Sequence, residues 1–401
     1  MMAAFYGLAF ANIFLRSTMG VLAPELAAEL ALTPTMLGAI ASAFFVSYAL
    51  LQIPTGMLLD RFGPRRTVIA MFAFTVVGVG LFASASTGGA MVFARLLMGA
   101  GCAGVFAAAF MVISRFFAAD RMTSIGGALN SFGMVGTLVA TAPLAALVVT
   151  FGWRASFAGI TLLMSAVAVL AIVTIRDYPA GHAVSYRARS ESIRTMLAGS
   201  LEVLRTPGVL PLASAGFALA AGNTLLGIWG GPYLNDVHGL NQVGRGTTLS
   251  FMAMAGVSGH FLFGQLARRL NTLKWIVVAG GVCITAITAT LAALPEPTLL
   301  TVTILLAALG FACSFPTILL AHARAMVPER LIGRGLTTVN TGIMAAIALM
   351  QIAVGGVIGL AAQADNGGDP ALPFRAAFAF LSTMALLSTL VYSRVEDRPP
   401  R

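Results

Sequence analysis

A positively charged side chain, Arg16, lies deep inside an apolar stretch of the sequence. It is about eleven residues into the stretch 5–27, or roughly 16 Å along a helix at about 1.5 Å per residue. In a bilayer-spanning helix this depth is central, and an arginine there costs about 2.5–3.5 kcal/mol or more unless it faces a wet cavity or a partner. The acidic residues Glu25 and Glu29 lie at the far end of the stretch. The spacing therefore indicates anion-binding chemistry, in which a bound anion supplies the missing negative charge.

A structural role for Arg16 stays open, because it could instead hydrogen-bond helix carbonyls and polar neighbours such as Asn12 and Tyr48. Arg95 is a second arginine inside an apolar stretch, 90–114, but it lies only about five residues from the start and is therefore shallower. We expect it to face the same cavity.

His260 is the histidine placed well inside an apolar segment. A neutral imidazole there could accept a proton near physiological pH, which makes His260 a candidate site for coupling transport to protons. A neutral, helix-packing imidazole is the alternative. The remaining polar and aromatic candidates in apolar segments are Asn130, Asn223, Trp229, Tyr233 and Asn340. The amides could bind a ligand or hold helices together, and the aromatic rings could line a pocket or anchor the chain at the membrane interface.

The composition places these residues in a membrane protein. Of 401 residues, 58% are hydrophobic and 9% are charged, against about 45–50% and about 25% in soluble domains. A spanning helix needs about 20 mainly apolar residues. The sequence predicts twelve such segments, approximately at 5–27, 36–57, 67–86, 90–114, 123–149, 154–175, 209–234, 246–267, 274–294, 298–321, 336–361 and 373–393.

The basic residues predict how these segments are oriented. If both termini are cytoplasmic, all but five of the 24 Lys and Arg residues fall on the cytoplasmic side; the exceptions are Arg16, Arg95, Arg154, Arg245 and Arg375. This asymmetry follows the positive-inside rule. Because the basic residues interrupt spanning segments, the net charge of +10 does not indicate nucleic-acid binding. The single lysine and the abundance of Ala, Gly and Arg suggest a bacterial source and hence the inner membrane.

Motifs for other chemistries are absent or misplaced. Residues 99–104 read Gly-Ala-Gly-Cys-Ala-Gly, but this Gly-x-Gly-x-x-Gly lies inside an apolar helix and not after a strand, so we do not expect dinucleotide binding. There is no phosphate-binding Gly-x-x-x-x-Gly-Lys sequence. No Ser/His, Asp/Asp or metal-ligand set shares one depth, and the three cysteines lack ligand spacing. We therefore predict that the chain is not an enzyme and has no cofactor or metal.

The longest polar stretch predicts two halves. Residues 176–207 follow the sixth segment without a sustained apolar face, and they separate a bundle at 1–175 from a second at 208–395, with a tail at 396–401. The halves resemble each other at a shift of about 208 or 209 residues, which aligns Pro24 with Pro232 and Arg115 with Arg324. Parallel six-helix repeats place a binding site between the halves near the bilayer midplane.

One loop carries a specific family resemblance. Residues 56–66 contain Gly, Pro and charged residues that can hardly continue a helix, so the flanking segments must turn back on each other. The sequence resembles the signature Gly-x-Leu-x-Asp-Arg-x-Gly-x-Arg-Arg of the major facilitator superfamily of secondary transporters. It matches at Gly56, Leu58, Asp60, Arg61, Gly63, Arg65 and Arg66. The resemblance implies an all-α fold of twelve helices in two pseudo-symmetric bundles, and it gives the loop a role in gating.

The first two segments are similar to the anion:cation symporter branch of that superfamily. The similarity rests on Arg16, Gly20 and Pro24 and on Tyr48, Gln52, Pro54 and Gly56. It implies that Arg16, with Asn12, Tyr48 and Gln52, binds an organic anion. The chain departs from the branch because Arg16 lacks an acidic neighbour and because the fourth segment lacks a carboxylate.

These observations predict a secondary transporter that moves a small organic anion by alternating access, with proton-coupled uptake. Its partners would be the anion, a coupling ion such as H⁺ and the lipid bilayer, and the short loops are compatible with a monomer. An exporter of amphipathic compounds is the alternative, although the drug-antiporter signature is degenerate in the fifth segment. A non-transporting receptor on the same scaffold also stays open.

Overall fold

The chain folds into long helices in the computed structural model, which describes residues 1–178, 199, 201–328, 331–365 and 368–398. No strand occurs in these residues. The first group of helices is α1 (Met2–Ser17), α2 (Met19–Leu30), α3 (Pro34–Ala83), α4 (Gly88–Cys102), α5 (Val105–Phe116), α6 (Ala119–Val139) and α7 (Ala142–Thr174). The second group is α9 (Val209–Thr224), the π-helix η1 (Leu225–Trp229), α10 (Gly230–Asp236), α11 (Gln242–Leu270), α12 (Lys274–Ala293), α13 (Leu299–Ala312), α14 (Pro316–Met326), α15 (Ile332–Asp365) and α16 (Leu372–Tyr392).

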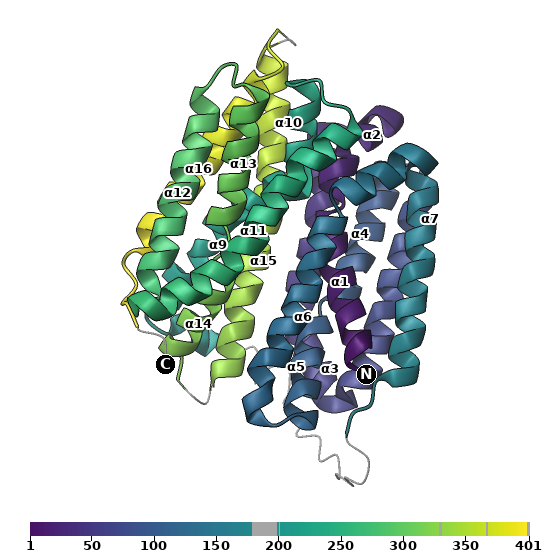
Figure 1. The fold of residues 1–401 in the computed structure, drawn as a ribbon, viewed down its shortest axis with the longest axis vertical. Helices are drawn as coiled ribbons and strands as arrows, with labels where there is room; N and C mark the ends of the chain where they lie inside the picture. Colours follow the sequence, from purple (N-terminus) through teal and green to yellow (C-terminus); the bar gives the residue numbers. More distant parts are fainter. Residues whose placement is uncertain (179–198, 200, 329–330, 366–367, 399–401) are drawn as a thin grey trace.

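The two groups of helices lie side by side, and both chain ends are marked at the same end of the molecule (Figure 1). At the opposite end α2 and α10 meet, so helices of the two groups contact each other there. Most of the predicted linker, residues 179–198 and 200, lies outside the described residues, as do residues 399–401 of the predicted tail. The domain boundaries therefore stay a prediction.

In the described residues, nine helices are long and apolar enough to cross a membrane, or ten if the bent pair α1 and α2 is one span. Two of the nine contain a glycine with a non-helical backbone, Gly63 in α3 and Gly152 in α7, with φ of 81° and 76°. These are the places where the sequence predicts breaks between separate spans. The all-helical membrane fold is confirmed, whereas the number of twelve spans stays a prediction.

The turn at residues 56–66 is tighter than the sequence suggests. We expected the whole stretch to interrupt the helix, but the helical hydrogen-bond pattern continues on both sides of Gly63, where the backbone leaves helical geometry. A positive φ is inexpensive for glycine, and Pro64 suits the first turn of the helix that follows because its missing N–H would be unpaired there anyway. One Gly-Pro pair therefore makes the turn, and Gly56, Asp60 and Arg61 remain helical.

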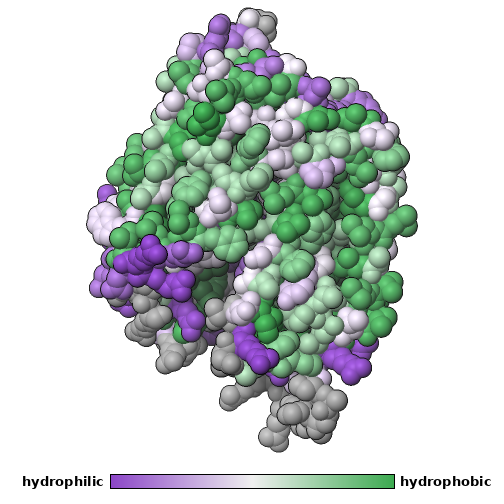
Figure 2. Space-filling model, in the orientation of Figure 1, coloured by the Kyte–Doolittle hydropathy of each residue, from purple (hydrophilic) through white to green (hydrophobic). Residues whose placement is uncertain are grey.

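The outer surface is apolar, as a bilayer requires. Large side chains such as Leu162, Val173 and Leu300 are each at least 70% exposed. Figure 2 shows hydrophobic residues over the middle of the molecule and hydrophilic residues gathered mainly toward its two ends. The same view shows a hollow near the end that carries the termini.

Candidate functional site

Arg16 lies in the last turn of α1, beside a break in the first span. α1 ends at Ser17, and α2 follows at an angle of 48°. A break leaves backbone carbonyls without helical partners. The Leu15 carbonyl accepts hydrogen bonds from Thr18 Oγ1 at 3.2 Å and from the buried Arg95 Nη1 at 2.6 Å. Arg95 thus ties α4 to the break that positions Arg16.

The Arg16 guanidinium packs on aromatic rings of α3. Its Cζ atom lies 4.7 Å from the centroid of Tyr48 and 5.9 Å from that of Phe45. Its Nε is buried and has no hydrogen-bond partner. Aromatic faces attract a guanidinium but do not neutralise its charge. Among the described residues, no carboxylate lies within ion-pair distance of Arg16.

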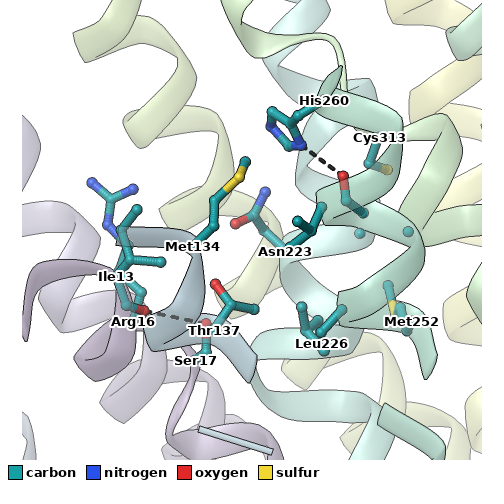
Figure 3. A pocket seen from close by; sticks show the side chains of 15 residues that line it. Ile13, Arg16, Ser17, Met134, Thr137, Asn223, Leu226, Met252, His260 and Cys313 are labelled. Carbon is teal, nitrogen blue, oxygen red and sulfur yellow. Dashed lines mark hydrogen bonds between the residues drawn. The ribbon is translucent and has the colours of Figure 1, made fainter. Parts of the chain in front are cut away.

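Arg16 lines a cavity of about 150 Å³ between the two groups of helices. Figure 3 shows Met134 and Asn223 extending between the Arg16 side and the His260 side. The lining residues are Ile13, Arg16, Ser17, Met134, Thr137, Gly222, Asn223, Leu226, Met252, Ala253, Gly256, Val257, His260, Gly310 and Cys313. Arg16 is the one lining side chain with a permanent charge. The cavity can therefore hold an anion opposite a largely neutral wall.

The wall that faces Arg16 comes from α9, η1, α11 and the end of α13. Asn223 donates from Nδ2 to the Leu219 carbonyl at 3.2 Å, which leaves its Oδ1 as an acceptor. His260 Nδ1 lies 2.8 Å from the Gly256 carbonyl (Figure 3), so the neutral ring donates from Nδ1 and keeps the Nε2 lone pair free. A π-helix, η1, replaces the α-helix directly after Asn223 and Thr224, a geometry that is frequent at functional sites.

The structure brings three of the predicted residues together around the cavity: Arg16, Asn223 and His260. The other eight predicted binding residues are not among its lining residues: Asn12, Tyr48, Gln52, Arg95, Asn130, Trp229, Tyr233 and Asn340. Tyr48 still contacts Arg16 through its ring.

Several of these residues have structural partners. Asn12 is buried and donates to the Cys102 carbonyl at 2.8 Å, and Asn130 donates to its own helix at Gly126. Tyr233 is buried between Phe374 and Phe378. Gln52 and Asn340 are half-buried, and Trp229 is buried. The prediction that Arg95 faces the cavity is wrong in this structure, because α4 turns that side chain toward the Leu15 carbonyl.

The predicted gating loop is held by a residue that the sequence did not single out. Asp177, just after α7, accepts a hydrogen bond from the Arg65 backbone N–H at 2.8 Å. The Arg65 side chain donates to the Ile172 carbonyl at 3.0 Å, and Arg66 is exposed. A Cβ at Gly63 would lie 2.8 Å from the Asp177 carboxylate, so this position needs glycine both for its φ and for space. The roles of the loop in gating stay a prediction.

The end opposite the termini is closed by contacts between the two groups of helices. Arg245 of α11 forms an ion pair with Glu25 of α2 and a hydrogen bond with Asn235 of α10. Thr141 and Ser250 are joined by a 2.8 Å hydrogen bond between their hydroxyl groups. These contacts hold the two groups of helices together on this side of the cavity.

The cavity residues that the sequence missed are mostly small or apolar: Ile13, Ser17, Met134, Thr137, Gly222, Leu226, Met252, Ala253, Gly256, Val257, Gly310 and Cys313. Nothing in their residue types distinguishes them from packing residues, so only the helix phase could have found them. In the described part of the chain, no group of three His, Cys, Asp or Glu side chains could hold a metal ion.

The bent first span, the paired helix groups and the cavity between them define a membrane transporter fold. The family model of the Major Facilitator Superfamily matches residues 5–350, and the chain belongs to that superfamily. Among solved structures, a bacterial homologue of the human lysosomal transporter Spinster, in an inward-facing and unoccupied conformation, superimposes with a TM-score of 0.78. It is 16% identical and covers 98% of this chain and 95% of its own, which confirms the fold.

Two curated relatives are named for organic acids. The "Probable sulfoacetate transporter SauU" of Cupriavidus necator is 29% identical over 35% of this chain and 33% of its own length. The "Hexuronate transporter" of Bacillus subtilis is 26% identical over 42% of this chain and 40% of its own length. The chain therefore spans about a third to two fifths of the length of these relatives.

Proposed function

We propose that the protein is a secondary transporter that moves a small organic anion across a bacterial inner membrane by alternating access. The observation that carries this proposal is Arg16, a guanidinium in the central cavity with aromatic neighbours and no described carboxylate partner. A positive charge held in a low-dielectric cavity is costly. A bound anion would offset that cost, and a cation would increase it. The relatives named for organic acids support the same substrate class.

The direction of access follows from the closed end. With both termini cytoplasmic, as the basic residues predict, the contacts at Glu25 and Arg245 close the outer side and the cavity opens inward. In this form the cavity exchanges its anion with the cytoplasm. We propose uptake, as the resemblance of the first two segments to a symporter branch implies, with the monomer as the working unit.

Proton coupling is assigned to His260. Its free Nε2 faces the cavity that also holds Arg16, so an added proton would place two positive charges in one cavity. An anion bound between them would stabilise both charges, and the proton in turn would raise the affinity for the anion. This reciprocal effect is what couples a substrate to an ion.

The test is anion binding by purified protein, read from the rise in apparent melting temperature with ligand. Arg16→Ala should weaken binding of a stabilising anion by at least about thirtyfold, the lower end for losing one partner of a buried charge pair. Arg16→Lys, which keeps the charge, should lose less. Cation binding that survives Arg16→Ala would instead support an exporter of amphipathic compounds.

A second measurement separates binding from coupling. His260→Gln should keep Arg16-dependent binding at neutral pH but lose accumulation driven by a proton gradient in proteoliposomes. Unchanged proton-driven accumulation in His260→Gln would remove His260 from the proposal and leave anion transport intact. Binding without any flux in the parent protein would favour a receptor.

A further inference from the structure

The residues that line the cavity with Arg16 form a mainly apolar wall. Six of the lining residues are aliphatic or thioether side chains: Ile13, Met134, Leu226, Met252, Ala253 and Val257. Three more are glycines, at 222, 256 and 310, and a further one is Cys313. Most of the wall therefore offers no side-chain hydrogen bond.

The few polar groups of the cavity are largely engaged within their own helices. Ser17 Oγ donates to the Ile13 carbonyl at 3.4 Å. Asn223 uses one amide N–H on Leu219, and His260 uses Nδ1 on Gly256. The Gly256 carbonyl also accepts from Ser314 at 2.7 Å, so it is doubly occupied. Besides Arg16, what remains for a ligand is the Thr137 hydroxyl, part of the Asn223 amide, His260 Nε2 and the lone pairs of Ser17.

A polyhydroxylated substrate would be poorly matched to this cavity. Each hydroxyl group that leaves water without a partner costs free energy. An apolar pocket rejects an added hydroxyl by up to about a hundredfold. Alternating access requires the cavity to close around its substrate and strip its water, so the mismatch cannot be repaired by solvent at that stage.

Resting on the proposed function, we infer that the substrate is a compact carboxylate or sulfonate whose body is apolar and carries few hydroxyl groups. The acid group binds Arg16, and the body packs on Met134, Val257 and Met252. This inference departs from the relative named for hexuronate, a hydroxylated sugar acid, because most residues that line this cavity offer its hydroxyl groups no hydrogen-bond partner.

The experiment compares binding within two matched pairs of six-carbon acids on the purified protein. Hexanoate and gluconate are both monoanions, and adipate and galactarate are both dianions, so charge is constant within each pair and only hydroxylation changes. Hexanesulfonate tests the sulfonate in place of the carboxylate. In a pair that binds in an Arg16-dependent manner, the member without hydroxyl groups should bind tighter by about a hundredfold.

A variant weakens the preference if the reasoning is right. Met134→Gln keeps the length of the side chain and adds an amide to the apolar wall, so it should reduce the discrimination against gluconate by about tenfold, the effect of one added hydrogen bond. Met134→Leu, which stays apolar, is the matched control and should keep the parent preference.

The outcomes distinguish this inference from the function on which it rests. If gluconate or galactarate binds as tightly as its unhydroxylated partner in an Arg16-dependent manner, the protein is an anion transporter but the inference is wrong. If none of the acids binds in a manner that depends on Arg16, the proposed function itself fails. Equal effects of Met134→Gln and Met134→Leu would also contradict the assigned wall.

Discussion

The closed end of the molecule depends on two glycines that leave room for backbones to touch. A Cβ at Gly231 of α10 would lie 1.9 Å from the carbonyl oxygen of Gly20 in α2, and a Cβ at Gly20 would lie 2.1 Å from that of Leu226. The other atoms near the Gly231 Cβ position also belong to α2. A methyl group at residue 231 should therefore force α2 and α10 apart and disturb little else.

The size of the effect follows from these distances. Ordinary contact begins at 3.4 Å, so the helices must separate by about 1.5 Å in Gly231→Ala. Overpacking of this kind costs about 1–3 kcal/mol. Because the cost applies only while this end is closed, it shifts the equilibrium toward the open form by about 5- to 150-fold.

The assay measures exposure of the closed end. A cysteine at position 250, which lies at the contact with Thr141, is introduced after the three native cysteines are replaced. Right-side-out vesicles are then treated with a membrane-impermeant maleimide. Gly231→Ala should speed labelling in proportion to the population shift, because the cysteine reacts when this end opens.

A matched control is available on α15. A Cβ at Gly356 meets nothing within 4 Å, although Gly356 is also a glycine in an apolar helix. Gly356→Ala should therefore label at the parent rate. Equal labelling rates in folded Gly231→Ala and Gly356→Ala would refute the claim that the glycine contact holds this end closed.

Three further predictions concern residues outside the cavity. Arg95→Met should weaken anion binding by roughly tenfold without contact to the ligand, because the Leu15 carbonyl at the helix break keeps Thr18 but loses its charged donor; an Arg95→Lys variant that restores affinity in the same binding assay would support the positioning role. Asp60→Ala should slow transport in proteoliposomes while leaving ligand affinity within about twofold, and an equal loss of both would contradict a gating role. Burial raises the pKa of Asp397. Hydrogen bonds from Thr272 and from two backbone N–H groups together lower it by more, so the net pKa is below its usual value. Asp397 therefore stabilises the fold above the ordinary carboxyl pKa, and the stability gap between the parent and Asp397→Ala should close as the pH of the unfolding assay falls through the depressed pKa.

Some of the site could be predicted because its signals are chemical. Arg16 is conspicuous as a charge within an apolar segment, and His260 and Asn223 as polar groups within others. The turn at Gly63 was also foreseen from its residues, although the helix reaches closer to it than expected. These features depend on residue type and depth along a helix, which the sequence contains.

Other parts depend on helix phase, which the sequence does not contain. Arg95 has the same signature as Arg16, a cation in an apolar helix, but α4 directs it toward the Leu15 carbonyl and away from the cavity. The π-helix η1 changes the phase of every residue that follows in this span, so Trp229 and Tyr233 could not be placed from a regular helical period. The contact of Asp177 with the turn at Gly63 and Arg65 could not be predicted from the sequence, because these residues are more than a hundred positions apart in the chain.

The backbone of η1 takes part both in the contacts at the closed end and in the wall of the cavity. Gly20 contacts the Leu226 carbonyl, and the Leu226 side chain lines the cavity. A Cβ at Gly227 would lie 3.8 Å from the Arg16 carbonyl, so η1 packs beside the break that carries the guanidinium. When α2 and α10 separate, this wall must move relative to Arg16. An anion that binds Arg16 while its body contacts the facing wall therefore has a different affinity for the open and closed forms, and such a difference is what a ligand needs to shift the equilibrium between them.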